Sequence, residues 1–231
     1  QLRGKNIYSL LVLLCFQLSY AQLSRTHYIP PISAADNSNA TPQNQYLHIS
    51  TPSVTPVSVT LTEIGGTVSV LSASNANPIE ILIGSGSNTS FIADVSTTGA
   101  KHSNKGYSIQ ADKPVYVSVR LIAGAGQAQA GSLVSKGLSG LGTIFRIGTF
   151  TNQKTFTSAT TDYLNFVSVM ATENNTQVDF SDLAPGTIVE NSTPLSVVLD
   201  YGETYVIALD PAVVSANRDG LVGALVSASK P

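Results

Sequence analysis

The feature that most constrains the fold is a stretch that occurs twice, 117 residues apart. Residues 106–114 read GYSIQADKP and residues 223–231 read GALVSASKP, so Gly, Ala, Lys and Pro recur in register. Three further pairs of segments match in the same order at similar spacing: 46–50 with 163–169, 55–68 with 176–189, and 78–86 with 194–202. Self-similarity at a nearly fixed offset indicates a repeated structural unit. We therefore expect two tandem, duplicated units.

The residues after the first Lys-Pro pair predict a strand with one buried face. In VYVSVRLI the apolar side chains Val115, Val117, Val119 and Leu121 alternate with Tyr116, Ser118 and Arg120, the period of a half-buried strand. Proline suits the start of a strand, where the first backbone donor is dispensable. By analogy, we expect the second unit to be incomplete and an equivalent strand to follow Pro231.

The rest of the pattern predicts an all-β protein of two sandwich-like units. Short β-branched or aromatic runs such as VSVTLTE (57–63) and TYVIAL (204–209) are separated by Gly, Asn, Asp, Ser and Pro. Strands at such short intervals favour a sandwich or a barrel. We expect a signal peptide at 1–21, an extended lead-in at 22–45, a first unit at 46–122, a Gly/Ala-rich loop with a connecting strand at 123–162, and a second unit at 163–231.

The first 21 residues have the composition of a secretory signal. Arg3 and Lys5 precede an apolar run at 7–16, and Ser19 and Ala21 have the spacing that signal peptidase requires. The run is too short to span a bilayer, so we expect no membrane span in the mature chain. Cys15 is the only cysteine of the chain and lies in this segment, so we expect no disulfide. The predicted location is secreted or on the outer cell surface.

Charge excludes several classes of partner. Charged residues make up 11% of the chain and the formal net charge is −2, against roughly 25% charged residues in average domains. Such a chain has no basic surface for nucleic acid or an anionic membrane. Polar Ser, Thr, Asn and Gln supply the soluble surface, a composition that favours an extracellular β protein.

No catalytic, metal or cofactor site emerges from the motifs. His27, His48 and His102 lack the spacing of zinc ligands. GSGSN (84–88), GLSGL (137–141) and GAGQAQAG (124–131) match neither a nucleophile elbow nor a phosphate-binding loop. We predict no cofactor and no enzyme activity.

Two weaker alternatives concern acidic and glycosylation motifs. Glu173, Asp179 and Asp182 could hold calcium, although an EF-hand has denser ligands, and Asp182 is more simply explained as a turn residue. Asn-x-Ser/Thr occurs at Asn39, Asn88, Asn174 and Asn191. These are polar turns in a bacterial chain and candidate glycan sites in an animal one.

Several longer segments resemble the N-terminal domain of the IgG-Fc-binding protein family: HYIPPI (27–32), YLHISTPSVTPVSVTLT (46–62), GYSIQADKPVYVSVRL (106–121), GSLVSKGLSGLGTIFRIGTF (131–150) and FVSVMATENNTQVDF (166–180). The resemblance is greatest to the version in large secreted proteins of gliding Bacteroidetes. It implies an N-terminal module of a long surface polypeptide exported by type IX secretion. Fc binding is a property of the family's disulfide-containing animal members, and we do not expect it in this chain.

Three hypotheses for function follow. The first is a noncatalytic surface or secreted module for adhesion or ligand binding, whose partners are a host or cell-surface protein or glycan and other domains of the same chain. Exposed strand positions such as Tyr116 and Arg120 are then candidate contacts, although both also suit an ordinary solvent face. The alternatives are a structural spacer or secretion-associated domain without a ligand, and a carbohydrate-binding or hydrolase-associated domain.

Overall fold

The computed structural model describes residues 22–34, 41–124, 129–149, 151, 164–192 and 194–231. The predicted signal peptide at 1–21 lies outside the described residues. Strands and short 3-10 turns make up the regular structure of the described part, so the all-β prediction is confirmed. Within these ranges, the chain forms no helix of the length and apolarity needed to cross a membrane.

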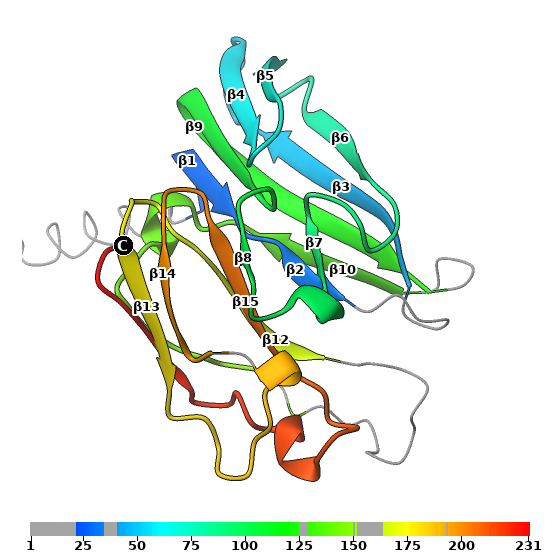
Figure 1. Cartoon of the computed structure of the whole chain (residues 1–231). Helices are drawn as coiled ribbons and strands as arrows, with labels where there is room; N and C mark the ends of the chain where they lie inside the picture. The colour runs from blue at the N-terminus through cyan, green and yellow to red at the C-terminus, as the bar shows by residue number, and fades with distance from the viewer. Residues whose placement is uncertain (1–21, 35–40, 125–128, 150, 152–163, 193) are drawn as a thin grey trace, which may run out of the picture.

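The N-terminal part is a bent seven-stranded sheet, which we call the first unit (Figure 1). Its path runs β5-β4-β9-β3-β6, and β1 and β10 also pair with β9. The strands are β1 (Ser24–Ile29), β3 (Pro42–Ser50), β4 (Val57–Glu63), β5 (Val68–Ala73), β6 (Ile79–Gly84), β9 (Tyr107–Ala123) and β10 (Gln129–Val134).

Strand β9 connects the two halves of this sheet. Its first half pairs with β1 and β4, and its second half pairs with β3 and β10. Lys113 and Pro114 lie between the halves, where no ladder partner is assigned to them. The prediction that Pro114 starts a strand is therefore wrong, because the strand continues through it. A residue without a backbone donor is tolerated there because the chain is changing partners.

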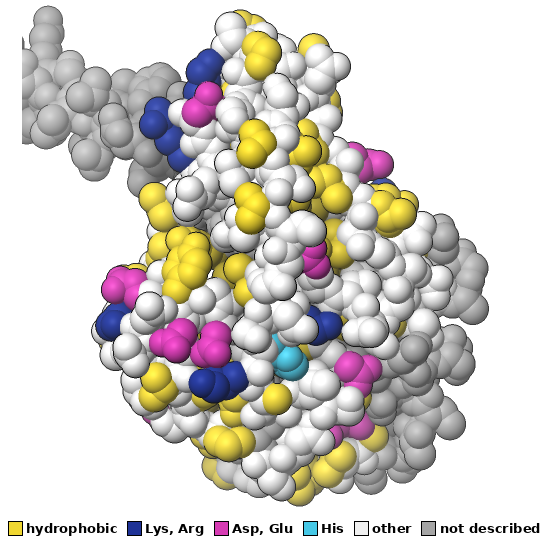
Figure 2. All heavy atoms as spheres, turned by 45° about the horizontal axis from the view of Figure 1, so that its top comes forward, with side chains coloured by type: hydrophobic (Ala, Val, Ile, Leu, Met, Phe, Trp, Pro, Cys, Tyr) yellow, Lys and Arg dark blue, Asp and Glu magenta, His cyan; other side chains and the backbone are white. Residues whose placement is uncertain are grey.

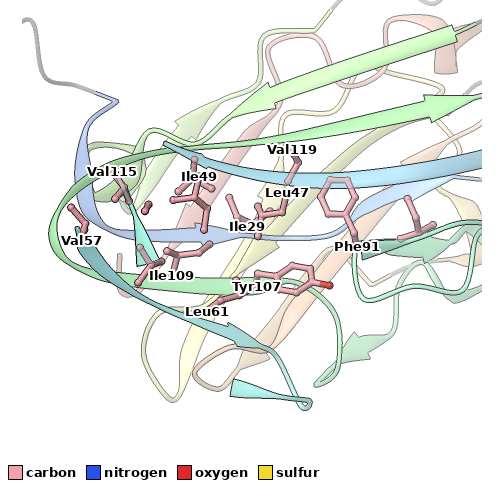
Figure 3. Packing of buried hydrophobic residues seen from close by; sticks show 14 residues of the cluster. Ile29, Leu47, Ile49, Val57, Leu61, Phe91, Tyr107, Ile109, Val115 and Val119 are labelled. Atoms are coloured by element: carbon pink, nitrogen blue, oxygen red, sulfur yellow. The ribbon is translucent and has the colours of Figure 1, made fainter. Parts of the chain in front are cut away.

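The first core lies inside the bend of this sheet. Figure 3 shows buried side chains of β4 and of both halves of β9 converging with Leu47 and Ile49 of β3. Val115 and Val117 are fully buried and Val119 is 3% exposed, whereas Tyr116, Ser118 and Arg120 face outward. The predicted alternation along 115–121 is thus confirmed at these positions.

The C-terminal part, the second unit, consists of two separate sheets. A four-stranded sheet has the order β11-β16-β13-β14, and a three-stranded sheet has the order β12-β15-β8. The second core lies between them and includes Val178, Phe180, Tyr205, Ile207 and Val226. The strands are β8 (Lys101–His102), β11 (Ile144–Arg146), β12 (Asn165–Met170), β13 (Thr176–Ser181), β14 (Ser196–Leu199), β15 (Thr204–Leu209) and β16 (Leu225–Ala228).

A short parallel pair joins the two units. Strand β2 (Ile32–Ala34) pairs with β7 (Ile92–Asp94) and contacts β12 and β15. All six residues of β15 are buried, because one face of this strand lines the second core and the other lies against the β2 side. The outer face of the three-stranded sheet is therefore covered.

The two units share one strand arrangement. In the first unit β9 lies between β1 and β4, with β5 beyond β4; in the second, β16 lies between β11 and β13, with β14 beyond β13. Ile109 pairs with Leu61 as Val226 pairs with Phe180. The repeated sequence thus occupies the same place in both ladders. The tandem duplication itself stays a prediction, because a shared strand order does not establish common origin.

One detail of the predicted repeat differs from the structure. The segments 78–86 and 194–202 were expected to correspond, but β6 pairs with β3 whereas β14 pairs with β13, the position that β5 has in the first unit. Both segments are apolar runs after a proline, and composition does not specify which neighbour such a strand pairs with.

The stretches expected to lack strands also contain them. The lead-in holds β1 and β2, and the Gly/Ala-rich stretch 123–142 holds β10 and a 3-10 turn at Gly137–Gly140. Small residues hide the apolar alternation on which strand prediction rests, so β10 forms through pairing with β9 and not through its own propensity.

Candidate functional site

His27 is a structural residue in the first unit. It is fully buried in β1, and its Nε2 lies 3.0 Å from the carbonyl of Val115 while its Nδ1 lies 2.9 Å from Oγ of Ser135. The geometry fits a neutral ring that donates from Nε2 and accepts at Nδ1. Burial lowers the pKa of His27, partly opposed by the carbonyls of Val115 and Ser24. This histidine ties β1 to the start of the second half of β9.

His102 lies in β8 and is buried. It pairs with Thr204 of β15. Burial lowers the pKa of His102, the backbone of Thr97 opposes this shift, and Lys105 adds to it. The buried side-chain atoms His102 Nε2 and Thr204 Oγ1 have no hydrogen-bond partner among the described residues.

The acidic residues proposed as calcium ligands do not converge. Asp182 has φ +56° and pairs with Arg146 at 2.5 Å, so it is a turn residue. Asp179 Oδ1 instead accepts from Gln177 and from Ser196. Across the described ranges, no group of three or more His, Cys, Asp or Glu side chains could hold a metal ion.

The glycosylation motifs occupy turns. Asn174 Oδ1 accepts from the backbone of Tyr201. Asn191 has φ +54° and donates to the carbonyl of Val95 and the hydroxyl of Thr98, both at 2.8 Å. Asn39 lies outside the described residues. The amide groups of Asn174 and Asn191 are thus used to hold loops together.

Tyr116 and Arg120 belong to the outward face of a four-stranded array, β10-β9-β3-β6, which we call the outer platform. Cross-strand partners share a face, so the ladder places Ser132, Arg120, Tyr46 and Leu82 in one row and Val134, Ser118, His48 and Glu80 in the next. Tyr116 follows beside Ser50. Sequence reasoning found only the β9 members, because the others come from strands whose register it could not assign.

The outer platform combines aromatic, apolar and charged groups. Leu82, Val134 and Tyr116 are 57%, 47% and 39% exposed. The Tyr46 and His48 rings lie with centroids 6.0 Å apart, and His48 Nδ1 lies 3.5 Å from Glu80 Oε2. Asn44 also donates to the hydroxyl of Tyr46, which restrains this ring. Semi-exposed tyrosine and arginine on a rigid sheet are suited to contacting a protein partner.

The surface as a whole is weakly charged. Figure 2 shows hydrophobic side chains lying singly or in small groups among uncharged ones, with few Lys, Arg, Asp or Glu on the face in view. Scattered apolar side chains are normal on a protein surface. The outer platform is therefore identified by the register of its side chains and not by a large apolar patch.

A second feature is a groove of about 390 Å³, lined mostly by the second unit and bordered by Tyr28 and Pro30 of the first. Its walls include the apolar side chains of Phe145, Ile147, Val167, Val169, Val178 and Val226, and Lys230 and Pro231 also line it. Val167, Val178 and Val226 belong to the second core as well. The second core is therefore open on this side.

Comparison with known proteins finds one similar family and one solved structure. The family model described as IgGFc binding protein matches residues 130–231, from β10 to the last residue. No curated protein matches. The crystal structure of Thermotoga maritima 1070 aligns with 48% of this chain and 92% of its own, at 13% identity and a TM-score of 0.23. The C-terminal part of this chain is thus similar to the IgGFc binding protein family.

Proposed function

We propose that this chain is a noncatalytic extracellular module that binds a protein partner through the outer platform. The observation that carries the proposal is the set of Tyr46, Tyr116, Arg120 and Leu82 on one outward face, on the side of the sheet opposite the first core. The similarity of residues 130–231 to a family named for a binding activity supports a binding role.

The platform has the physical properties of a binding surface. Tyrosine and arginine contribute strongly to protein interfaces because they bury large areas and retain polar groups that can form hydrogen bonds. The strands hold their backbones in place, so little ordering entropy is lost on binding. Arg120 and Glu80 provide charges of both signs, which favours a polar protein surface over a lipid or a nucleic acid.

Export and adhesion are parts of the same proposal. The signal-like residues 1–21 and the low charge of the chain support a secreted or outer-surface location, and we place the module in a large surface polypeptide of the gliding Bacteroidetes type, exported by type IX secretion. Its partner is then a host or cell-surface protein. Fc binding is not part of the proposal, since it belongs to the animal members of the family.

The test is a binding screen with a matched pair of variants. The purified chain is applied to an array of extracellular proteins and glycans, and each hit is repeated with the double variant Tyr116→Ala/Arg120→Ala. Loss of at least tenfold in affinity, about 1.4 kcal/mol, is expected. The control is Val68→Ala/Val70→Ala on β5, whose side chains are exposed outside the platform, and it should bind normally.

Two results would count against this function. If a partner binds the platform variant with unchanged affinity but no longer binds the β5 variant, the binding surface lies elsewhere. A screen without any protein hit would favour the structural spacer, and hits confined to glycans would favour the carbohydrate-binding alternative.

A further inference from the structure

We propose that the groove of the second unit is the seat of a β-strand that continues the chain from Pro231 and pairs antiparallel with the open edge of β12. In the first unit the second half of β9 has this position.

The edge of β12 opposite β15 is unpaired among the described strands, because β12 ends the order β12-β15-β8. Ala171 donates to the carbonyl of Glu203 at 3.0 Å and accepts from Gly202 at 2.9 Å. Alternate residues of an antiparallel strand bond to the same neighbour. The backbone groups of Phe166, Ser168 and Met170 therefore point to the open edge, where another strand can pair with them.

The groove lies along this edge. Five consecutive residues of β12 and its extension, 167–171, line it. Since neighbouring residues of a strand point to opposite faces, a hollow touched by all five lies beside the strand and not on one face of it. Its volume would hold roughly a dozen waters at ~30 Å³ each, yet many of its lining side chains are apolar. Apolar side chains of an inserted strand suit these walls better than water does.

The chain reaches the groove at Lys230-Pro231, and the contacts of this corner match those of Lys113-Pro114 in the first unit. Thr51 donates to the carbonyl of Pro114 at 3.1 Å, and Thr172 donates to the carbonyl of Pro231. Lys113 Nζ reaches Ser53, and Lys230 Nζ reaches the carbonyl of Asn174. Both corners therefore hold their proline against the turn that follows β3 or β12.

A third pair of contacts strengthens the match. The backbone of Ser58 donates to Asp112 at 3.0 Å, and the backbone of Gln177 donates to Ser229 at 2.9 Å. Asp112 and Ser229 each lie two residues before the corner proline. The approach to both corner prolines is therefore held by matching contacts.

The first unit shows what the inserted strand does. After Pro114 the chain pairs with β3, with Val117 opposite Ile49 and Val119 opposite Leu47. Val115, Val117 and Val119 close the first core. In the second unit β12 has the position of β3, and the groove lies beside β12, where the counterparts of Val115, Val117 and Val119 are expected. The proposed strand must therefore have apolar residues at the first, third and fifth positions after Pro231.

The first test reads the residues that the gene encodes after Pro231. The expected result is a run with apolar side chains at positions one, three and five and without a proline. A stop codon at this point, or a polar segment, would overturn the proposal.

The second test extends the protein. The chain is produced with VYVSVRLIA, the sequence of residues 115–123, appended to Pro231, and hydrogen exchange is measured at Ser168 and Met170. At least tenfold slower exchange than in the unextended chain is expected. A scrambled extension of the same composition is the control and should leave exchange unchanged.

A variant separates insertion at the edge from unspecific contact. Ser168→Pro removes an amide that points to the open edge and leaves the ladder to β15 intact, so the extended variant should show no added protection at Met170. Ser168→Ala should retain it. Protection that appears without the extension and rises with protein concentration would instead assign the groove to a second copy of the chain. Equal protection by both extensions would overturn the proposal.

Discussion

The two units of the molecule share a strand arrangement but differ in how their cores are closed. In the first unit, β9 passes from one half of the sheet to the other, and its valines cover the core. In the second unit, β16 ends the described chain on one sheet, and a groove of about 390 Å³ opens beside the other. The comparison indicates that a single crossing strand converts two packed sheets into one continuous bent sheet.

The outer faces of the two units also differ: the face is exposed in the first unit and covered in the second. The β3-β6 part of the first unit exposes the outer platform, whereas the corresponding face of β12 and β15 lies against β2. In the second unit, this face of the sheet contacts β2 and joins the two units. In the first unit, the corresponding face is exposed and is free to bind a partner. For this reason the proposed binding site and the proposed strand-accepting groove lie in different units.

The largest expected effect concerns Gly106 and Gly223, which occupy matching positions in the repeated sequence. Gly106 has φ +100°, and an added Cβ would meet the carbonyl of Ile29 at 2.6 Å and also Met170. Gly106→Ala should therefore cost about 3 kcal/mol or more. Gly223 has φ +78° with open space around it, so Gly223→Ala should cost about 1–2 kcal/mol. Denaturant unfolding measures both, and equal losses would contradict the comparison.

A smaller difference is expected between two matched valines. Val59 and Val178 are ladder partners of Ala111 and Ala228, and only Val178 borders the groove. Val59→Ala should lose about 2–3 kcal/mol through lost burial and a new cavity. Val178→Ala should lose about 1–2 kcal/mol, because its surroundings are already open. A larger loss at Val178 in equilibrium unfolding would show that the second core is as closed as the first.

Stability should also depend on pH through His27 and His102. Burial lowers the pKa of both side chains below 6.5, so below about pH 6.5 the unfolded chain binds protons that the folded chain does not. The free energy of unfolding should therefore be constant above this pH and fall on acidification. Thermal melts from pH 8 to 5 measure the fall, and His27→Asn should reduce its slope. A slope of the opposite sign would contradict the neutral assignments.

The smallest effect is expected at the two corner threonines. Thr51 is buried and its bond to Pro114 is partly shielded, so Thr51→Val should cost about 1 kcal/mol. The bond from Thr172 to Pro231 is exposed, so Thr172→Val should cost a few tenths of that amount, roughly 0.3 kcal/mol. In the chain extended by VYVSVRLIA the Thr172 loss should approach that of Thr51. Unfolding midpoints of the two single variants, the extended variant Thr172→Val and the two parent chains provide the measurement, and a Thr172 loss unaffected by the extension would separate the two corners.

Prediction from sequence succeeded where the signal is local. The alternation after Pro114 correctly predicted which side of β9 is buried, because a period of two is a property of consecutive residues. It failed where the answer depends on distant partners. Pro114 is tolerated inside β9 because the strand changes neighbours there, and β10 is a strand only because β9 is beside it.

The candidate sites show the same division. Tyr116 and Arg120 were predicted as exposed, but Tyr46 and Leu82 join them only through the registers of β3 and β6. The groove could not be predicted at all, because its walls come from β1, β11, β12, β13 and β16 and from the segment 140–142. The Lys-Pro repeat predicted that a strand follows Pro231, but it did not predict where that strand would lie or that a groove would be present.

Site-resolved hydrogen exchange of the unextended chain tests the comparison most directly. The amide of His48 in β3 lies in a strand paired on both sides, whereas those of Ser168 and Met170 point to the open edge of β12. We predict that Ser168 and Met170 exchange much faster than His48, and faster than Val167 and Val169 of their own strand. Comparable slow exchange at all five amides would show that the edge of β12 is already occupied, which would contradict the account.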